Sequence, residues 1–214
     1  MSKEPRIPGQ RSESSHRKQT VEGFASAAET IGPITPGMSL FAITRGQFSM
    51  IDAIFHCLEQ VGPAQISLWT WTIADYEIEV VCGLMNRAEI TGATLVIDAS
   101  ADRRNRKIID QWRGKFGAKS VKVCKNHAKI ARVWTADRRL LLRGSMNLNF
   151  NPRFEQLDIT ADGPDFDLVE RIENELPVLP RKYSNADAES ATGVNRSFEY
   201  KTLQMFRGLT TWHK

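Results

Sequence analysis

Apolar side chains recur every three to four positions in four stretches of the chain, the spacing that places them on one face of a helix. Gly62, which precedes a proline, is expected to end the first helix. Asp75 is expected to cap the second helix and Gly92 to close it. The predicted helices cover 47–61, 103–116 and 166–176, with a further one from Asp75 to Gly92.

Shorter stretches alternate in polarity or are rich in β-branched and aromatic residues, which is typical of strands. These predicted strands are 38–43, 65–72, 93–97, 120–124, 128–134, 139–143 and 156–160. The strands at 128–134 and 139–143 are joined across Thr135-Ala136-Asp137, so we expect them to pair as an antiparallel hairpin. Strand and helix alternate through the first 120 residues, which predicts an α/β fold with a mixed, largely parallel sheet covered on both faces.

Composition divides the chain into three parts. Residues 1–20 are polar and basic and are expected to form a disordered arm, and 21–180 would form the folded domain. Residues 181–214 are expected to hold a small polar linker, 184–193, and then a tail with aromatic residues that packs on the domain, binds a partner or closes a dimer. The N-terminal stretch has no apolar signal region and the longest apolar runs are strand-length, so we expect a cytoplasmic protein without stable membrane association.

Charge is unevenly distributed along the chain. The formal net charge is +4, yet the segment from Arg103 to Arg143 holds 14 lysine or arginine side chains and two aspartates. This excess favours a polyanionic partner, although a solvated helix face would have the same composition. The three cysteines are far apart and lie in apolar segments, so buried thiols are expected rather than a disulfide framework or a metal site.

The residues that could carry chemistry are concentrated within thirty positions. His127 and Lys129 lie two apart on a predicted strand, so both side chains should leave the same face, with Ala128 on the buried one. A His-x-Lys pair alone is common by chance. The following predicted strand delivers Ser145 and Asn147, in a Gly-Ser-x-Asn run that alone would indicate only a turn or a helix cap.

Together with Glu155, these side chains could cleave a phosphodiester without a metal or another cofactor. His127 could attack phosphorus, Glu155 could orient it, and Lys129 and Asn147 could stabilise the charge on the phosphoryl oxygens. The leaving oxygen also needs an acid, and the chain contains no second His-x-Lys. A symmetric homodimer would supply the missing histidine from a second chain.

These motifs resemble those of the phospholipase D superfamily. The matching runs are His-Ala-Lys at 127–129, Gly-Ser-Met-Asn at 144–147 and Arg-Phe-Glu at 153–155, and the resemblance covers roughly 38–176. It implies an α/β/α sandwich and, for a single motif per chain, a homodimer with one shared site. It also implies that His127 becomes phosphorylated, that Lys129, Asn147 and Ser145 bind phosphate, and that Glu155 orients a histidine. The family usually has Asp where this chain has Trp134.

We therefore expect a metal-independent nuclease, with DNA favoured over RNA as its substrate. The alternatives are a lipid phosphodiesterase with the same chemistry and an inactive nucleic-acid-binding member of the fold. Three side chains, Arg103, Arg104 and Arg106, are candidates for backbone phosphate contacts, or else a solvated helix face. The aromatic pair Trp69 and Trp71 could stack on bases, although core packing is the simpler expectation.

Overall fold

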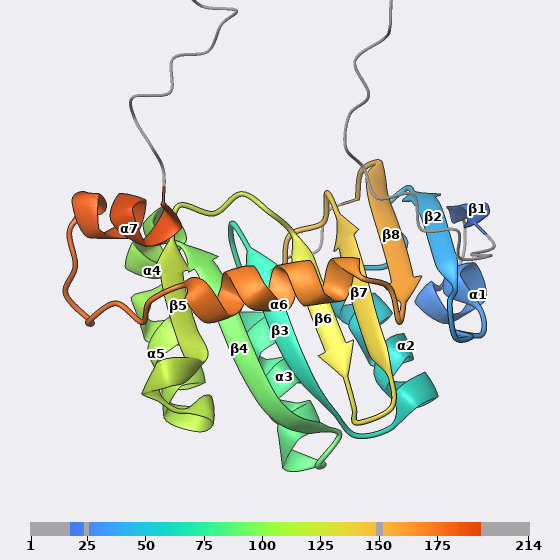
Figure 1. The fold of residues 1–214 in the computed structure, drawn as a ribbon, viewed down its shortest axis with the longest axis horizontal. Helices are drawn as coiled ribbons and strands as arrows, with labels where there is room; N and C mark the ends of the chain where they lie inside the picture. Colours follow the sequence, from blue (N-terminus) through green and yellow to red (C-terminus); the bar gives the residue numbers. More distant parts are fainter. Residues whose placement is uncertain (1–17, 24–25, 149–151, 194–214) are drawn as a thin grey trace, which may run out of the picture.

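The computed structural model describes residues 18–23, 26–148 and 152–193, and within these ranges the strands form one eight-stranded sheet. The predicted tail at 196–214 lies outside the described residues, as does most of the predicted arm. The strand order is β1-β2-β8-β7-β6-β3-β4-β5 (Figure 1). The bounds are β1 Lys18–Gly23, β2 Ser39–Thr44, β3 Ala64–Thr70, β4 Ile90–Asp98, β5 Val121–Cys124, β6 Ile130–Trp134, β7 Arg139–Gly144 and β8 Glu155–Ala161.

The sheet is mixed, as predicted, but its parallel part is the smaller one. In the described residues, β1 with β2, β3 with β4, and β4 with β5 are parallel pairs. The pairs β2 with β8, β8 with β7, β7 with β6, and β6 with β3 are antiparallel. Short links account for two of these pairs, β6 with β7 and β7 with β8, because a connection of a few residues joins antiparallel neighbours.

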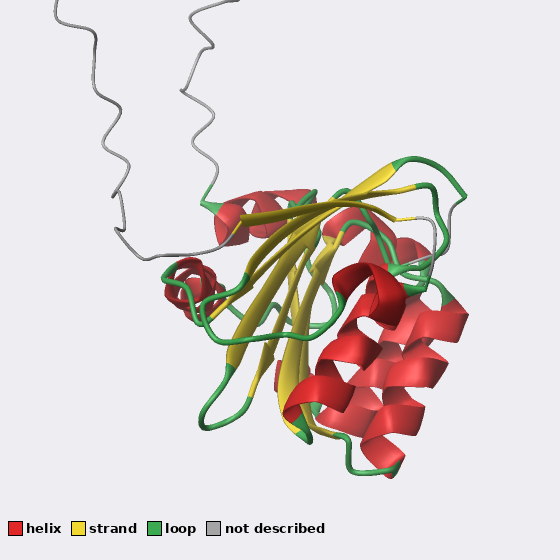
Figure 2. Cartoon of the chain, turned by 90° about the vertical axis from the view of Figure 1, so that its right-hand side faces the viewer, coloured by secondary structure: helices red, strands yellow, loops and turns green. Residues whose placement is uncertain are grey.

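Helices cover both faces of the sheet. Figure 2 shows a group of helices on one side and a single helix seen end-on at the other, and Figure 1 identifies the single helix as α6. α7 lies beside β5 at one edge. The arrangement is an α/β/α sandwich. The helix bounds are α1 Ala27–Ile31, α2 Met50–Val61, α3 Asp75–Asn86, α4 Ala99–Arg104, α5 Arg106–Phe116, α6 Asp165–Glu175 and α7 Asn185–Thr192, with a 3-10 turn at Ala118–Ser120.

The apolar periodicity of the sequence explains which helix faces are buried. In α2 the side chains of Ile54 and Leu58, one turn apart, lie in the main core, and Ser49 caps the helix in a capping box with Asp52. In α5 the buried side chain of Trp112 faces the same core. A smaller cluster of Leu141, Phe166 and Val169 fills the space between the sheet and α6.

Several boundaries differ from the predicted ones for local reasons. The helix expected at 103–116 is two helices, α4 and α5, separated at Asn105, whose backbone φ of −109° and ψ of 33° is not helical. Asp75 begins α3 and Ala74 occupies its cap position without a side-chain hydrogen bond. Gly92 lies within β4 rather than at the end of a helix, because the chain turns earlier, at Ala88 with a φ of 57°.

Two segments contain regular elements that the sequence did not predict. The arm was expected to be disordered up to residue 20, but β1 begins at Lys18 and pairs with β2. The linker expected at 184–193 is mostly helix α7, which Ser184 and Asp187 begin with a capping box. That Ser-x-x-Asp spacing was the available signal for a helix start. Among the described residues, no helix combines the length and the apolar character needed to cross a bilayer.

Candidate active site

The predicted catalytic side chains meet where the strands terminate on one side of the sheet. Strands β2, β3, β4, β5 and β7 end there, and β6 and β8 begin there. In open α/β sheets, ligands bind outside the carboxyl ends of strands. A pocket of about 560 Å³ opens here. Its lining residues are Trp71, His127, Ala128, Lys129, Gly144, Ser145, Asn147, Arg153, Phe154 and Glu155. The structure thus brings all five predicted side chains into one pocket, and their catalytic roles stay predictions.

His127 and Lys129 do not share a strand face as expected. Both precede β6, in an irregular segment, and it is Ala128 that is exposed while Lys129 is buried. Their side chains nevertheless meet. The Lys129 ammonium donates to the backbone carbonyl of His127 at 2.7 Å, and its Nζ lies 3.0 Å from Nδ1 and 3.3 Å from Nε2 of the His127 ring. The cation and the candidate nucleophile are therefore in direct contact.

Asn126, which the sequence reasoning missed, holds this irregular segment in place. Its side chain is buried; the amide nitrogen donates to the carbonyls of Thr70 (3.0 Å) and Ala128 (3.2 Å), and the amide oxygen accepts from Ala128 N (3.0 Å). Its backbone N–H donates to the buried carboxylate of Asp98 at 3.1 Å. His127 is thus flanked by hydrogen bonds to the ends of β3 and β4. An Asn that bonds to the backbone two residues on is the signal that could have indicated a turn here.

Ser145 and Glu155 form a pair on the other side of the pocket. The Ser145 hydroxyl donates to Glu155 Oε2 and accepts from the backbone N–H of Gln156 at 3.0 Å. Gly144 makes this approach possible, because a Cβ at that position would lie 2.1 Å from the carbonyl oxygen of Gln156. Among the residues that the structure describes, the His127 side chain contacts that of Lys129, whereas Glu155 accepts from Ser145.

Asn147 carries a buried amide oxygen that has no hydrogen-bond partner among the described residues. The residue lines the pocket between the end of β7 and the bridge of Leu148 to Ile73. Buried polar atoms are seldom left unpaired, because the desolvation penalty is then uncompensated. The unpaired atom is an acceptor and would be satisfied by a donor, whereas the amide nitrogen of the same side chain is the group that can donate to a phosphoryl oxygen.

Burial lowers the pKa of Lys129 below the usual value for lysine, and the negative charge of Glu155 partly opposes this effect. The two effects have different origins. Desolvation disfavours the ammonium, whereas a nearby carboxylate favours it. The charge of Glu155 therefore helps Lys129 to keep the proton that lets it bind an anion.

The three arginines predicted to contact phosphate have different surroundings. The guanidinium of Arg104 lies 5.7 Å from the centre of the Trp71 ring, which places it at the pocket edge. Arg103 instead donates to Asn185 at 2.7 Å and lies over the Tyr183 ring. The charge of Arg106, like that of Arg103, acts to lower the pKa of Tyr183, and Arg106 does not line the pocket.

The two tryptophans also separate into different roles. Trp69 packs against the small cluster beneath α6, and its ring nitrogen donates to Glu173 at 2.8 Å, as core packing predicts. Trp71 is exposed by 38% and lines the pocket, with its ring centre 5.8 Å from that of His127. The core explanation thus applies to Trp69, while Trp71 belongs to the site.

Trp134, which stands where the resembling family has Asp, is remote from the pocket. It pairs with Gln65 and Arg139 at the opposite end of β6. Its ring lies edge-on to Phe166 and next to the guanidinium of Arg132. Trp134 therefore contributes to the packing beneath α6 and not to the lining of the pocket.

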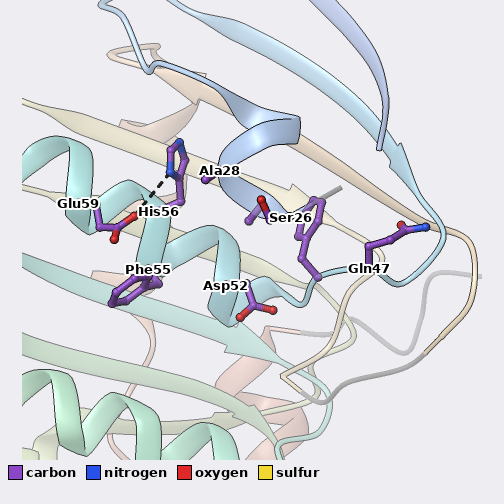
Figure 3. A pocket seen from close by; sticks show the side chains of 9 residues that line it. Ser26, Ala28, Gln47, Asp52, Phe55, His56 and Glu59 are labelled. Carbon is purple, nitrogen blue, oxygen red and sulfur yellow. Dashed lines mark ion pairs between the residues drawn. The ribbon is translucent and has the colours of Figure 1, made fainter. Parts of the chain in front are cut away.

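A second pocket, of about 350 Å³, lies between α1 and α2 (Figure 3). His56 points into this region, but its Nε2 is 2.8 Å from the carbonyl oxygen of Gly32, and its Nδ1 is 3.9 Å from Glu59. The ring therefore ties α2 to the end of α1. Within the described part of the chain, no group of three or more His, Cys, Asp or Glu side chains could hold a metal ion.

Comparisons with known proteins add a likeness of the backbone alone. No protein-family model matches the chain, and no curated protein matches it. Among solved structures, a polyphosphate kinase from Porphyromonas gingivalis is similar over 68% of this chain, with 15% identity and a TM-score of 0.47. The chain covers 27% of that kinase. The functional argument therefore rests on the side chains that line the pocket.

Proposed function

We propose that this protein is a metal-independent phosphodiesterase of the phospholipase D type that cleaves nucleic acid. The observation that carries the proposal is the contact between the Lys129 ammonium and the His127 ring, in a pocket that also contains Ser145, Asn147 and Glu155. A nucleophile, a cation in contact with it and an amide in the same pocket are what a metal-free phosphoryl transfer needs.

In the first step, a neutral ring nitrogen of His127 attacks phosphorus. A P–N bond forms, the P–O bond to the leaving oxygen breaks, and an acid donates a proton to that oxygen. Water then attacks the phosphohistidine, the P–N bond breaks, and the former acid takes the proton from water. The same histidine is thus the leaving group of the second step and is regenerated.

Phosphate binding would rearrange the contacts of Lys129. Without substrate, the ammonium donates to the backbone and the ring of His127. A phosphoryl oxygen is a stronger acceptor than either and would attract the ammonium, which leaves the ring nitrogen available for attack. The side-chain amide of Asn147 would donate to a second oxygen, and Ser145 would support the phosphate from the β7 end.

The acid would be the partner's His127 in a homodimer. The other histidine in the described residues, His56, belongs to the pocket between α1 and α2 and not to this one. A two-fold axis beside the pocket would bring two copies of His127 to one phosphate. Glu155 accepts from Ser145 through Oε2, and its other carboxylate oxygen would orient the partner's His127.

The proposal is tested by cleavage in EDTA. The purified chain is expected to cut plasmid or single-stranded DNA with EDTA present, and to elute at twice its 24.2 kDa mass. Binding without cleavage of DNA or RNA would contradict the proposal and indicate an inactive binding protein. Release of lipid head groups without action on nucleic acid would also contradict it. A monomer with full activity would exclude the shared site.

Replacing Glu155 with glutamine is expected to move the alkaline limb of the pH profile of kcat/KM to lower pH. Burial already lowers the pKa of Lys129, and the Glu155 charge opposes that effect, so removing the charge lowers the pKa further. The ammonium is then lost at lower pH. The measurement is the shape of the profile rather than its height, with Glu175→Gln on α6 as control. An alkaline limb that stays in place or moves to higher pH would contradict the effect of the Glu155 charge on the pKa of Lys129.

A further inference from the structure

Two exposed aromatic side chains stand on different segments that line the proposed active-site pocket. Trp71 follows β3 and is 38% exposed; Phe154 precedes β8 and is 67% exposed. Both line the pocket. A third exposed aromatic, Tyr76, lies in the first turn of α3, which begins near the same edge of the sheet. Large apolar rings that remain in water at the opening of a pocket are typical of a binding surface.

Each of the two lining rings is accompanied by an arginine. The guanidinium carbon of Arg104 lies 5.7 Å from the Trp71 ring centre, and that of Arg45 lies 5.0 Å from the Phe154 ring centre. The arginines come from the end of α4 and from the residue after β2, so two unrelated parts of the fold produce the same pairing. Aromatic rings beside cations suit a ligand that has flat apolar faces and regularly spaced negative charges.

The positive charge around the pocket favours an anionic ligand as the partner of these rings. Lys129 and Arg153 also line the pocket, in addition to the two arginines at the aromatic rings, and Glu155 is the acidic lining residue. In the proposed dimer, the second chain would bring its own arginines toward the same region and would add to this positive charge rather than compensate it. An anionic polymer would compensate the charge instead.

We propose that the pocket receives unpaired nucleotides, so that the substrate is single-stranded nucleic acid or a locally opened strand. One base would stack on Trp71 and another on Phe154, and Arg104 and Arg45 would contact the adjacent phosphates. Bases within a duplex are already stacked on both faces and offer no face to these rings. This inference rests on the proposed function, because it places the scissile phosphate between the two rings, at His127.

The test measures binding without turnover. The His127→Ala protein is titrated in EDTA, at one salt concentration, with a fluorescein-labelled 12-nucleotide DNA strand and with the duplex of the same sequence. Trp71→Ala and Phe154→Ala are each expected to weaken single-strand binding by about fivefold to 150-fold, and duplex binding by less than about threefold. Trp71→Phe should restore most of the loss. Phe55→Ala is the matched control, because Phe55 is half-exposed on α2 and lines the other pocket (Figure 3).

Unchanged single-strand affinity in both alanine variants would overturn the inference, and so would an equal loss for single strand and duplex. A shift from dimer to monomer in the variants would show that a second copy covers the rings, which also overturns it. The proposed function fails separately. If the wild type cleaves in EDTA and the aromatic variants bind single strands normally, the proposed function stands and this inference fails. If the aromatic variants lose single-strand binding but the wild type does not cleave, the binding site stands and the proposed function fails.

Discussion

Replacing His127 with alanine is expected to lower the rate of DNA cleavage in EDTA by on the order of 10⁴-fold or more, since the loss of a covalent nucleophile removes the reaction path itself. The protein should remain folded, because His127 is exposed and its bracing residue, Asn126, is untouched. His56→Gln is the matched control, since His56 lies in the other pocket. Full activity in His127→Ala would refute the assigned nucleophile.

Mixed dimers give the sharper version of this experiment. Wild-type and His127→Ala chains with different tags can be co-expressed, and the heterodimer isolated by two affinity steps. If both histidines serve one phosphate, the heterodimer is inactive, and a random equal mixture retains about a quarter of the wild-type activity. A heterodimer with about half the activity of the wild-type dimer would show that each chain has an independent site.

The second large effect concerns stability, at the face of the sheet that α6 covers. Glu173, 4% exposed, accepts from Arg132 at 2.9 Å, from the Trp69 ring nitrogen at 2.8 Å and from the Ser67 hydroxyl. Arg132 is 2% exposed, and among the described residues it has one further carboxylate partner, the more exposed Glu170 at 3.0 Å. Removing the Glu173 carboxylate would thus leave a buried cation poorly compensated.

Glu173→Ala is therefore expected to lower the free energy of unfolding by about 3–5 kcal/mol, the cost of breaking one side of a buried ion pair. In a chain of this size the melting temperature would fall by about 10 °C. Glu175→Ala is the matched control on α6, because its ion pair with Arg171 is exposed and should contribute less than about 1 kcal/mol.

The double variant Arg132→Met with Glu173→Met should recover most of the lost stability, because it removes the charge together with its partner. Thermal unfolding of the four proteins measures both effects. A fall in Glu173→Ala no larger than that in Glu175→Ala would contradict the prediction, and so would a double variant as unstable as Glu173→Ala.

Elements with one buried face could be predicted from local sequence patterns. The 3.6-residue period predicted α2 closely, and alternation predicted β3, because each depends on which face of one element is buried. The five pocket residues were found from motif chemistry alone. The surroundings of Lys129 were not, since a buried lysine before a strand depends on Asn126 rather than on any period.

Contacts between residues far apart in the sequence could not be predicted, because no local pattern depends on them. Arg132 sits in a strand and reads as one more basic surface residue, but its partner Glu173 lies 41 positions later on α6. The aromatic–arginine pairs join Arg45 to Phe154 across more than a hundred residues. In contrast, the capping box that begins α7 is local and could have been recognised.

The strand order determines when the pocket can form during synthesis of the chain. β6 pairs with β3 from about sixty residues earlier, and β8 pairs with β2 from more than a hundred residues earlier. A chain under synthesis therefore contains His127 and Lys129 well before Glu155 and the β8 backbone next to Gly144 have been added. The pocket of one chain can therefore be completed only after β8 has been synthesised, which makes its assembly a late event in the synthesis of the chain.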